Sequence, residues 1–132
     1  MKPRPQVIAG KTYQVETGMG KMRVVINDDE AGAMFEMFLY LGKTGSIGAS
    51  TAEGFGRLIS TALRHNVPPE ELAAQLFGIR SPRTTMHQGE MIWSLPHGVA
   101  VCMLKHLGKT PADIENVNTD PADHDTLEAM RR

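Results

Sequence analysis

The chain has 132 residues, a length typical of one domain, and its 41% hydrophobic and 22% charged residues are ordinary for a globular protein. Its formal net charge of −1 gives no overall attraction to nucleic acid, so we expect nucleic-acid binding to be absent and any anion site to be a local cluster. A single cysteine, Cys102, excludes an internal disulfide and is typical of a reducing cytoplasm. We find no signal peptide and no apolar run of membrane-spanning length, and expect a cytoplasmic protein.

The first third of the chain predicts an extended arm followed by an antiparallel three-stranded meander. Residues 1–10 contain two prolines and form the expected arm. Apolar and polar residues alternate in 11–17 and 21–28, as in strands with one buried face, and the Gly-Met-Gly turn at 18–20 is typical of a hairpin. Residues 34–41 are apolar nearly throughout, which predicts a central strand that is buried on both faces.

The glycine-rich turn at 42–46 leads into the strongest helix pattern of the chain. Apolar residues recur at helical spacing from Phe55 to Leu63, and Asn66 before two prolines marks the end of the helix. Small residues recur at every fourth position in a ridge formed by Gly48, Ala52 and Gly56. This small-residue ridge predicts the close approach of another backbone, for which a second copy of the chain is a candidate, and we expect a homo-oligomer.

Two further helices follow, separated by a loop. The second helix, at 69–77, begins with a proline and two glutamates near its positive end. The loop at 79–90 contains two arginines, a proline, a histidine and a glycine, and short strand-like pieces are compatible with its sequence. Ser94 is placed to cap a third helix at 95–107, and Gly108 is placed to end it.

These elements predict an α+β fold, a three-stranded antiparallel meander followed by three packed helices, in a single domain at 11–108. The acidic tail at 109–132 lacks a strong apolar stripe. We expect the tail either to be disordered or to dock on the domain through its apolar side chains. Those side chains are Ile114, Val117, Leu127 and Met130.

Basic side chains near the glycine turn favour a site for an anionic ligand. The Gly-Lys-Thr-Gly-Ser sequence at 42–46 lacks the upstream glycine of a P-loop, because Met37 occupies that position. A turn before a helix N-terminus still favours an anion, although a simple helix cap explains the same residue types. The arginines either converge on a phosphate or form a solvated, ion-paired surface, and Trp93 either stacks a base or anchors the core. The candidate ligand-binding residues are Lys43, Thr44, Ser46, Arg57, Arg64, Arg80, Arg83 and Trp93.

No set of residues has the spacing of a catalytic centre or of a complete metal site. Cys102 and His106 are four residues apart on a helix, which a metal can use, but no second ligand pair accompanies them. A buried cysteine beside a histidine that caps the helix C-terminus explains this pair. Ser94 and His97 have no acid placed to orient the histidine. We therefore expect neither catalysis, nor a metal, nor a cofactor.

Four short motifs along the chain form a pattern that is typical of one known family. They are Phe-Glu-x-Phe at 35–38, Leu-Gly-Lys-x-Gly at 41–45, Gly-Arg-Leu-Ile-Ser at 56–60 and Gly-Ile-Arg at 78–80. Over about residues 4–108 the chain resembles the TSCPD domain, the C-terminal module of adenosylcobalamin-dependent (class II) ribonucleotide reductases. The resemblance implies a TSCPD module that stands free as a small protein.

The chain departs from this family at its signature, a Thr-Ser-Cys-Pro-Asp motif at the start of the last helix. Here 93–97 reads Trp-Ser-Leu-Pro-His, and Ser81 replaces a cysteine that many relatives have after Gly-Ile-Arg. Thiol or metal roles of those cysteines therefore do not carry over. The catalytic barrel, radical cysteine and cobalamin site of the reductase do not fit into 132 residues.

The resemblance to part of a nucleotide-metabolising enzyme, together with the basic residues, predicts a non-catalytic module that binds a nucleotide-type or other phosphate-bearing ligand. A free-standing binder of this kind, for example one from a phage, would sequester a nucleotide signal. The alternative is a protein-interaction module that docks on a ribonucleotide reductase or another host enzyme and regulates it. Its expected surface is the small-residue ridge together with the arm at 1–10.

Overall fold

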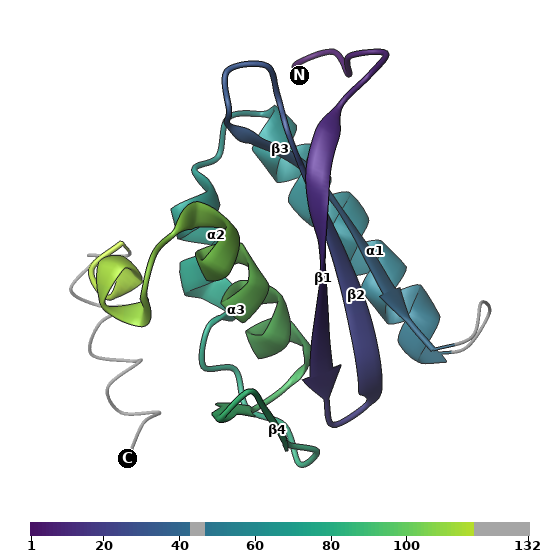
Figure 1. Ribbon diagram of the computed structural model, residues 1–132, viewed down its shortest axis with the longest axis vertical. Helices are drawn as coiled ribbons and strands as arrows, with labels where there is room; N and C mark the ends of the chain where they lie inside the picture. Colours follow the sequence, from purple (N-terminus) through teal and green to yellow (C-terminus); the bar gives the residue numbers. More distant parts are fainter. Residues whose placement is uncertain (43–46, 118–132) are drawn as a thin grey trace.

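The computed structural model describes residues 1–42 and 47–117 of the chain. The three-stranded sheet and the three helices that follow it confirm the predicted α+β fold (Figure 1). A short hairpin lies between the second and third helices, and one turn of 3-10 helix follows the third. The elements are β1 (Ala9–Thr17), β2 (Gly20–Asp28), β3 (Met34–Leu41), α1 (Ile47–Arg64), α2 (Pro69–Leu76), β4 (Thr85–His87), β5 (Glu90–Ile92), α3 (Leu95–Leu107) and η1 (Pro111–Ile114).

The strands β1, β2 and β3 form an antiparallel meander in that order. A two-residue turn joins the first two strands, as predicted, because Thr17 pairs with Gly20. Alternate side chains of all three strands enter the core, whereas Phe38 and Tyr40 on the opposite face are 41% and 52% exposed. The buried side chains of the inner face include Val15, Met22, Val24, Ile26, Met37 and Leu39.

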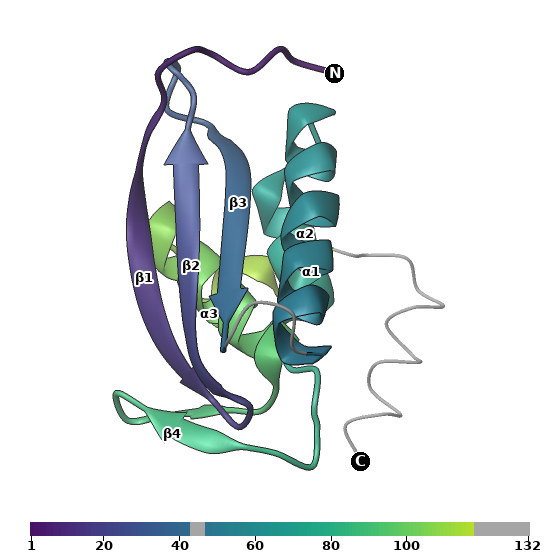
Figure 2. The same cartoon turned by 90° about the vertical axis from the view of Figure 1, so that its right-hand side faces the viewer.

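The prediction that residues 34–41 form a central strand is wrong, because β3 lies at the edge of the sheet. Among residues 1–42 and 47–117 it pairs with β2 alone, and α1 runs alongside it (Figure 2). The Ser60 hydroxyl of α1 accepts a hydrogen bond from the Met37 N–H and donates one to the Met37 carbonyl, both at 2.9 Å. The helix thus satisfies polar groups at an edge that would otherwise be open to another strand.

The small-residue ridge faces β3 of the same chain. Ala52 is fully buried, and a Cβ added at Gly56 would lie 3.2 Å from the Met37 carbonyl oxygen and 3.4 Å from the Leu39 nitrogen. A Cβ at Gly48 would lie 3.2 Å from the Leu41 side chain. The close backbone partner that the sequence predicts is therefore β3, and the ridge is not a surface for a second copy.

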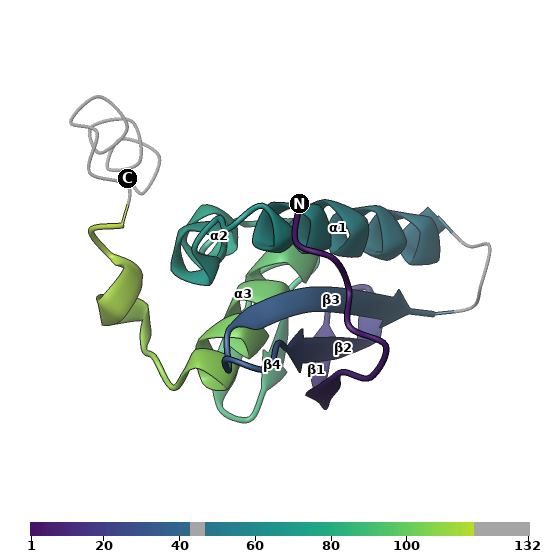
Figure 3. The ribbon, with the colours of Figure 1, turned by 90° about the horizontal axis from the view of Figure 1, so that it is seen from above.

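Helix α3 is the most buried helix and packs against α2 and the inner side of the sheet (Figure 3). The Ser94 hydroxyl accepts a hydrogen bond from the His97 N–H at 3.1 Å, which confirms the predicted cap. Gly108 has a left-handed φ of 66° and ends the helix as predicted. The β4–β5 hairpin begins inside the loop predicted at 79–90 and runs two residues beyond it, to Ile92. Its His87 accepts a hydrogen bond from the Glu16 N–H.

The N-terminal arm lies across one end of the domain. Ala9 and Gly10, expected in the arm, belong to β1. The Lys2 N–H donates to the Arg64 carbonyl at 3.0 Å, and the Lys2 side chain forms a 3.5 Å ion pair with Asp29. The arm is therefore bonded to the domain both at the end of α1 and at the turn after β2.

The first part of the predicted tail docks on the domain. Ile114 of η1 is only 5% exposed and joins the core, and Val117 packs partly against it. Leu127 and Met130 lie outside the described residues. In the part of the chain that the structure describes, no helix has both the length and the apolar character needed to cross a bilayer.

Candidate functional site

A groove runs between α1 and β3 and has a volume of about 560 Å³. Phe38 and Tyr40 line it from the strand, Arg57 and Thr61 line it from the helix, and Gly56 belongs to both its lining and the close helix–strand contact. The groove exists because the small-residue ridge lets the helix backbone approach the strand, so that longer side chains on either side stand above the contact. We call it the α1–β3 groove.

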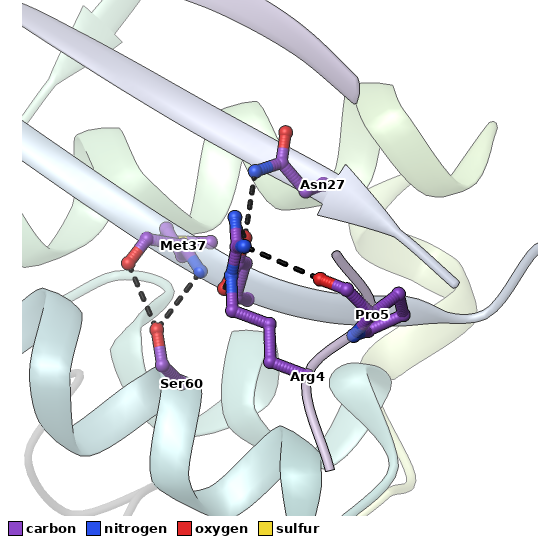
Figure 4. Close-up of polar contacts among 6 residues, drawn as sticks. Arg4, Pro5, Asn27, Met37 and Ser60 are labelled. Atoms are coloured by element: carbon purple, nitrogen blue, oxygen red, sulfur yellow. Dashed lines mark hydrogen bonds and ion pairs between the residues drawn. The ribbon is translucent and has the colours of Figure 1, made fainter. Parts of the chain in front are cut away.

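Glu36 lines the groove, and its carboxylate is held by two side chains from other segments, Arg4 and Asn27, which are labelled in Figure 4. The Arg4 Nε and Nη2 atoms donate to its two oxygens at 2.9 Å, and the Asn27 amide donates to Oε1 at 2.9 Å. Burial alone would raise the pKa of Glu36, but the hydrogen bonds from Arg4 and Asn27 outweigh it and hold this pKa below its ordinary value of 4.5. Glu36 is therefore ionised at neutral pH, and its charge is matched within the chain.

The two predicted arginines of α1 both line the groove, but they differ in how firmly they are held. Arg64 donates through Nε and Nη2 to the Lys2 carbonyl, at 3.0 and 2.9 Å, and lies over the Phe35 ring. Arg57 pairs with Glu53 at 3.0 Å, and their side chains are 80% and 64% exposed. An exposed pair of this kind is worth about 0.3–0.5 kcal/mol, so it restrains Arg57 only weakly.

The other predicted site residues belong to a different part of the molecule. The Arg80 guanidinium lies over the Trp93 ring, 4.6 Å from its centroid. The Arg83 carbonyl accepts a hydrogen bond from the Ser81 hydroxyl and lies close to Gly18 of the β1–β2 turn. The structure therefore places Arg57 and Arg64 along one groove but does not bring all four arginines together. Three further predicted residues, Lys43, Thr44 and Ser46, lie outside the described residues.

A tyrosine, a histidine and an aspartate form a hydrogen-bonded chain that sequence reasoning missed. The Tyr13 hydroxyl lies 2.9 Å from His106 Nδ1, and His106 Nε2 lies 2.8 and 2.9 Å from the Asp28 carboxylate oxygens. Burial, with smaller contributions from Cys102 and Asp28, raises the pKa of Tyr13. The Asp28 carboxylate accepts a hydrogen bond from His106 Nε2–H, and the Tyr13 hydroxyl is hydrogen-bonded to Nδ1. Tyr13, His106 and Asp28 are not among the residues that line the α1–β3 groove. Their hydrogen bonds join the end of α3 to β1 and β2.

The interpretation of His106 as a cap of the α3 C-terminus is wrong, because both of its ring nitrogens are bonded to side chains of the sheet. Cys102 is buried, as expected, and burial raises the pKa of its thiol to about 12. Within residues 1–42 and 47–117, no three His, Cys, Asp or Glu side chains gather where they could hold a metal ion.

The protein is thus a small α+β domain made of a meander and three helices. A groove lined by both acidic and basic side chains lies beside its edge strand β3. A comparison with protein-family models matches the TSCPD domain over residues 1–107, which ends at the last residue of α3. The chain belongs to the TSCPD domain family, as the motifs predict. Searches of curated proteins and of solved structures found no match.

Proposed function

We propose that the chain is a non-catalytic binding module for a nucleotide-type or other phosphate-bearing ligand, which lies in the α1–β3 groove. The observation that supports this proposal is that the exposed Arg57 guanidinium and the exposed Tyr40 ring line the same groove of about 560 Å³. Guanidinium groups pair with phosphate oxygens, and aromatic rings stack on bases. The volume lies in the usual range for small-molecule sites.

The charges along the groove favour an anion at the helix side. Three arginines and two glutamates line it, which leaves one net positive charge. Glu36 is neutralised by Arg4, so the remaining acid is Glu53, which is exposed and weakly paired. A phosphate that reaches Arg57 thus replaces a weak ion pair with a stronger, charge-assisted one.

A binder without chemistry acts by lowering the free concentration of its ligand. Its effect depends on affinity and abundance alone, which suits a signalling nucleotide present at low concentration. For a phage-encoded protein, the corresponding role is sequestration of a nucleotide signal of the host.

Isothermal titration against a panel of mono-, di- and cyclic nucleotides tests this proposal. We expect at least one nucleotide to bind and Arg57→Ala to weaken its binding by about ten- to a hundredfold, because one charge-assisted contact is worth about 1.5–3 kcal/mol. Arg80→Ala is the matched control, since Arg80 lies on Trp93 and does not line the groove. A silent panel, or equal losses in the two variants, would contradict the proposal.

A protein-interaction module is the second candidate, favoured by exposed apolar side chains beside the groove. They are Phe38 and Tyr40, which line the groove from β3 and are 41% and 52% exposed. Of the surface expected from the sequence, the small-residue ridge packs on β3, whereas the arm is bonded to the domain at Lys2 and stays largely exposed. A pull-down that recovers a reductase with the unchanged protein but not with Phe38→Asp, together with a silent nucleotide panel, would favour this function.

A further inference from the structure

We propose that a second cavity, lined by Trp93 and the middle of α3, binds a planar aromatic anion such as an aromatic carboxylate or sulfonate. The cavity has a volume of about 340 Å³ and is bounded by the end of α2, by β5, by α3 and by η1. It shares no lining residue with the α1–β3 groove. Its apolar lining consists of Phe77, Met91, Trp93, Val101, Leu104 and Pro111.

Aromatic rings form one wall of this cavity and favour a flat ligand. The His97 and Phe77 rings lie 4.6 Å apart, centroid to centroid, and both line the space. His97 is 5% exposed, and its Nδ1 accepts a hydrogen bond from the Gly78 N–H at 2.8 Å, so the ring is fixed in place. Burial lowers the pKa of His97, which keeps this wall neutral at physiological pH.

The departures from the family signature are what create this wall. Trp93 and His97 stand where the signature has threonine and aspartate, and both side chains line the cavity. The Arg80 guanidinium stacks on Trp93, 4.6 Å from the ring centroid, which helps to orient the indole. Two of the residues that line the cavity therefore differ from the family signature.

The charges around the cavity select an anion. Lys105 and Lys109 line it, against a single acid, Glu90. Lys109 forms an ion pair with Glu70 at 2.9 Å. Lys105 donates to the side-chain amide oxygen of Gln88, also at 2.9 Å, and because this amide is neutral it does not cancel the positive charge of Lys105. A ligand fits this cavity if its anionic group lies beside Lys105 and its aromatic ring packs against the apolar lining. A cavity of about 340 Å³ suits a ligand of about one or two rings.

Trp93 is the only tryptophan of the chain, so its fluorescence reports directly on this cavity. Titration with 1-naphthoate should quench Trp93 saturably with one ligand per chain, and the neutral analogue 1-naphthalenemethanol should bind at least about fivefold more weakly. Lys105→Gln should weaken naphthoate binding by about the same factor, whereas Lys105→Arg should retain it. Val101→Phe, which fills the cavity, should abolish binding.

Two controls separate this site from the groove and from loss of fold. Arg57→Ala should leave naphthoate binding unchanged, and nucleotides that bind the groove should not compete. Thermal melts should show that Lys105→Gln, a change at the protein surface, remains folded. The proposal is overturned if naphthoate does not quench Trp93, if the neutral analogue binds equally well, or if Lys105→Gln binds like the unchanged protein. It is also overturned if Arg57→Ala removes the binding, because the site would then be the groove.

Discussion

Gly56 of α1 lies against the backbone of β3, so that a methyl group at this position would come within 3.2 Å of the Met37 carbonyl oxygen. This contact sets the separation of helix and strand and thereby shapes the α1–β3 groove. It also places the helix where a further strand would otherwise pair with β3. The shape of the groove and the protection of the sheet edge therefore depend on the same glycine.

Substitution of Gly56 tests this contact. Gly56→Val should lower the free energy of unfolding by about 1–3 kcal/mol, because its side chain must push helix and strand apart. Gly54→Ala is the matched control two residues earlier in the same helix, since nothing lies within 4 Å of a Cβ at Gly54. It should raise stability by about 0.5–1 kcal/mol through helix propensity. Urea denaturation measures both, and a Gly56→Val protein as stable as the unchanged one would disprove the close packing.

The Ser60 hydroxyl gives a second prediction at the sheet edge. Ser60→Ala removes the hydroxyl that bonds both the N–H and the carbonyl of Met37, and should lower the free energy of unfolding by about 1–3 kcal/mol. The amide hydrogen of Met37 should then exchange faster with solvent. Ser50→Ala should change stability by less than about 0.5 kcal/mol, because Ser50 is exposed and its hydroxyl donates to the carbonyl of Ile47 in its own helix. Equal effects of the two variants would argue against the edge contact.

The Glu36 cluster predicts a specific loss of stability in acid. The pKa of Glu36 in the folded state is lower than the ordinary value of 4.5, so Glu36 binds a proton more readily in the unfolded chain. The stabilisation is fully present above that value and disappears as the pH falls through the folded pKa. Glu36→Gln should therefore reduce stability at neutral pH and flatten its decline down to about pH 3. Denaturant titrations across this range would show a parallel decline in both proteins if Glu36 has no such role.

The Tyr13–His106–Asp28 chain should show coupled energetics. Tyr13→Phe should cost about 0.5–1.5 kcal/mol, because it removes one hydrogen bond and keeps the ring. In a double-mutant cycle with Asp28→Asn, the loss of stability in the double variant should differ from the sum of the two single losses by about 0.5 kcal/mol or more, because Tyr13 and Asp28 bond the same imidazole. Tyr40→Phe, at an exposed ring, serves as the neutral control. Strict additivity would mean that the two hydrogen bonds act independently.

Features with a local signal could be predicted from the sequence. The hairpin turn at 18–19, the cap at Ser94 and the stop at Gly108 depend on a few neighbouring residues, and all three are present. The order of the elements follows from such signals. The family assignment rests on short motifs that are equally local.

Features that depend on distant contacts could not be predicted. An apolar run such as 34–41 is the same for a central strand and for an edge strand covered by a helix, and only the second is observed. The bond between Asp28 and His106 joins residues 78 positions apart, and no spacing rule connects them. The sequence likewise indicates which arginines could bind an anion, but not where each one lies. Arg57 and Arg64 line the groove, whereas Arg80 lies over Trp93.

The most direct test of the proposed function is a ¹H–¹⁵N correlation spectrum recorded during titration with each nucleotide of the panel. The account predicts shift changes confined to the amides around the groove, at 38–40 and 56–61, together with the side-chain Nε–H of Arg57. Unchanged spectra with every nucleotide, or changes confined to β5 and α3, would contradict it.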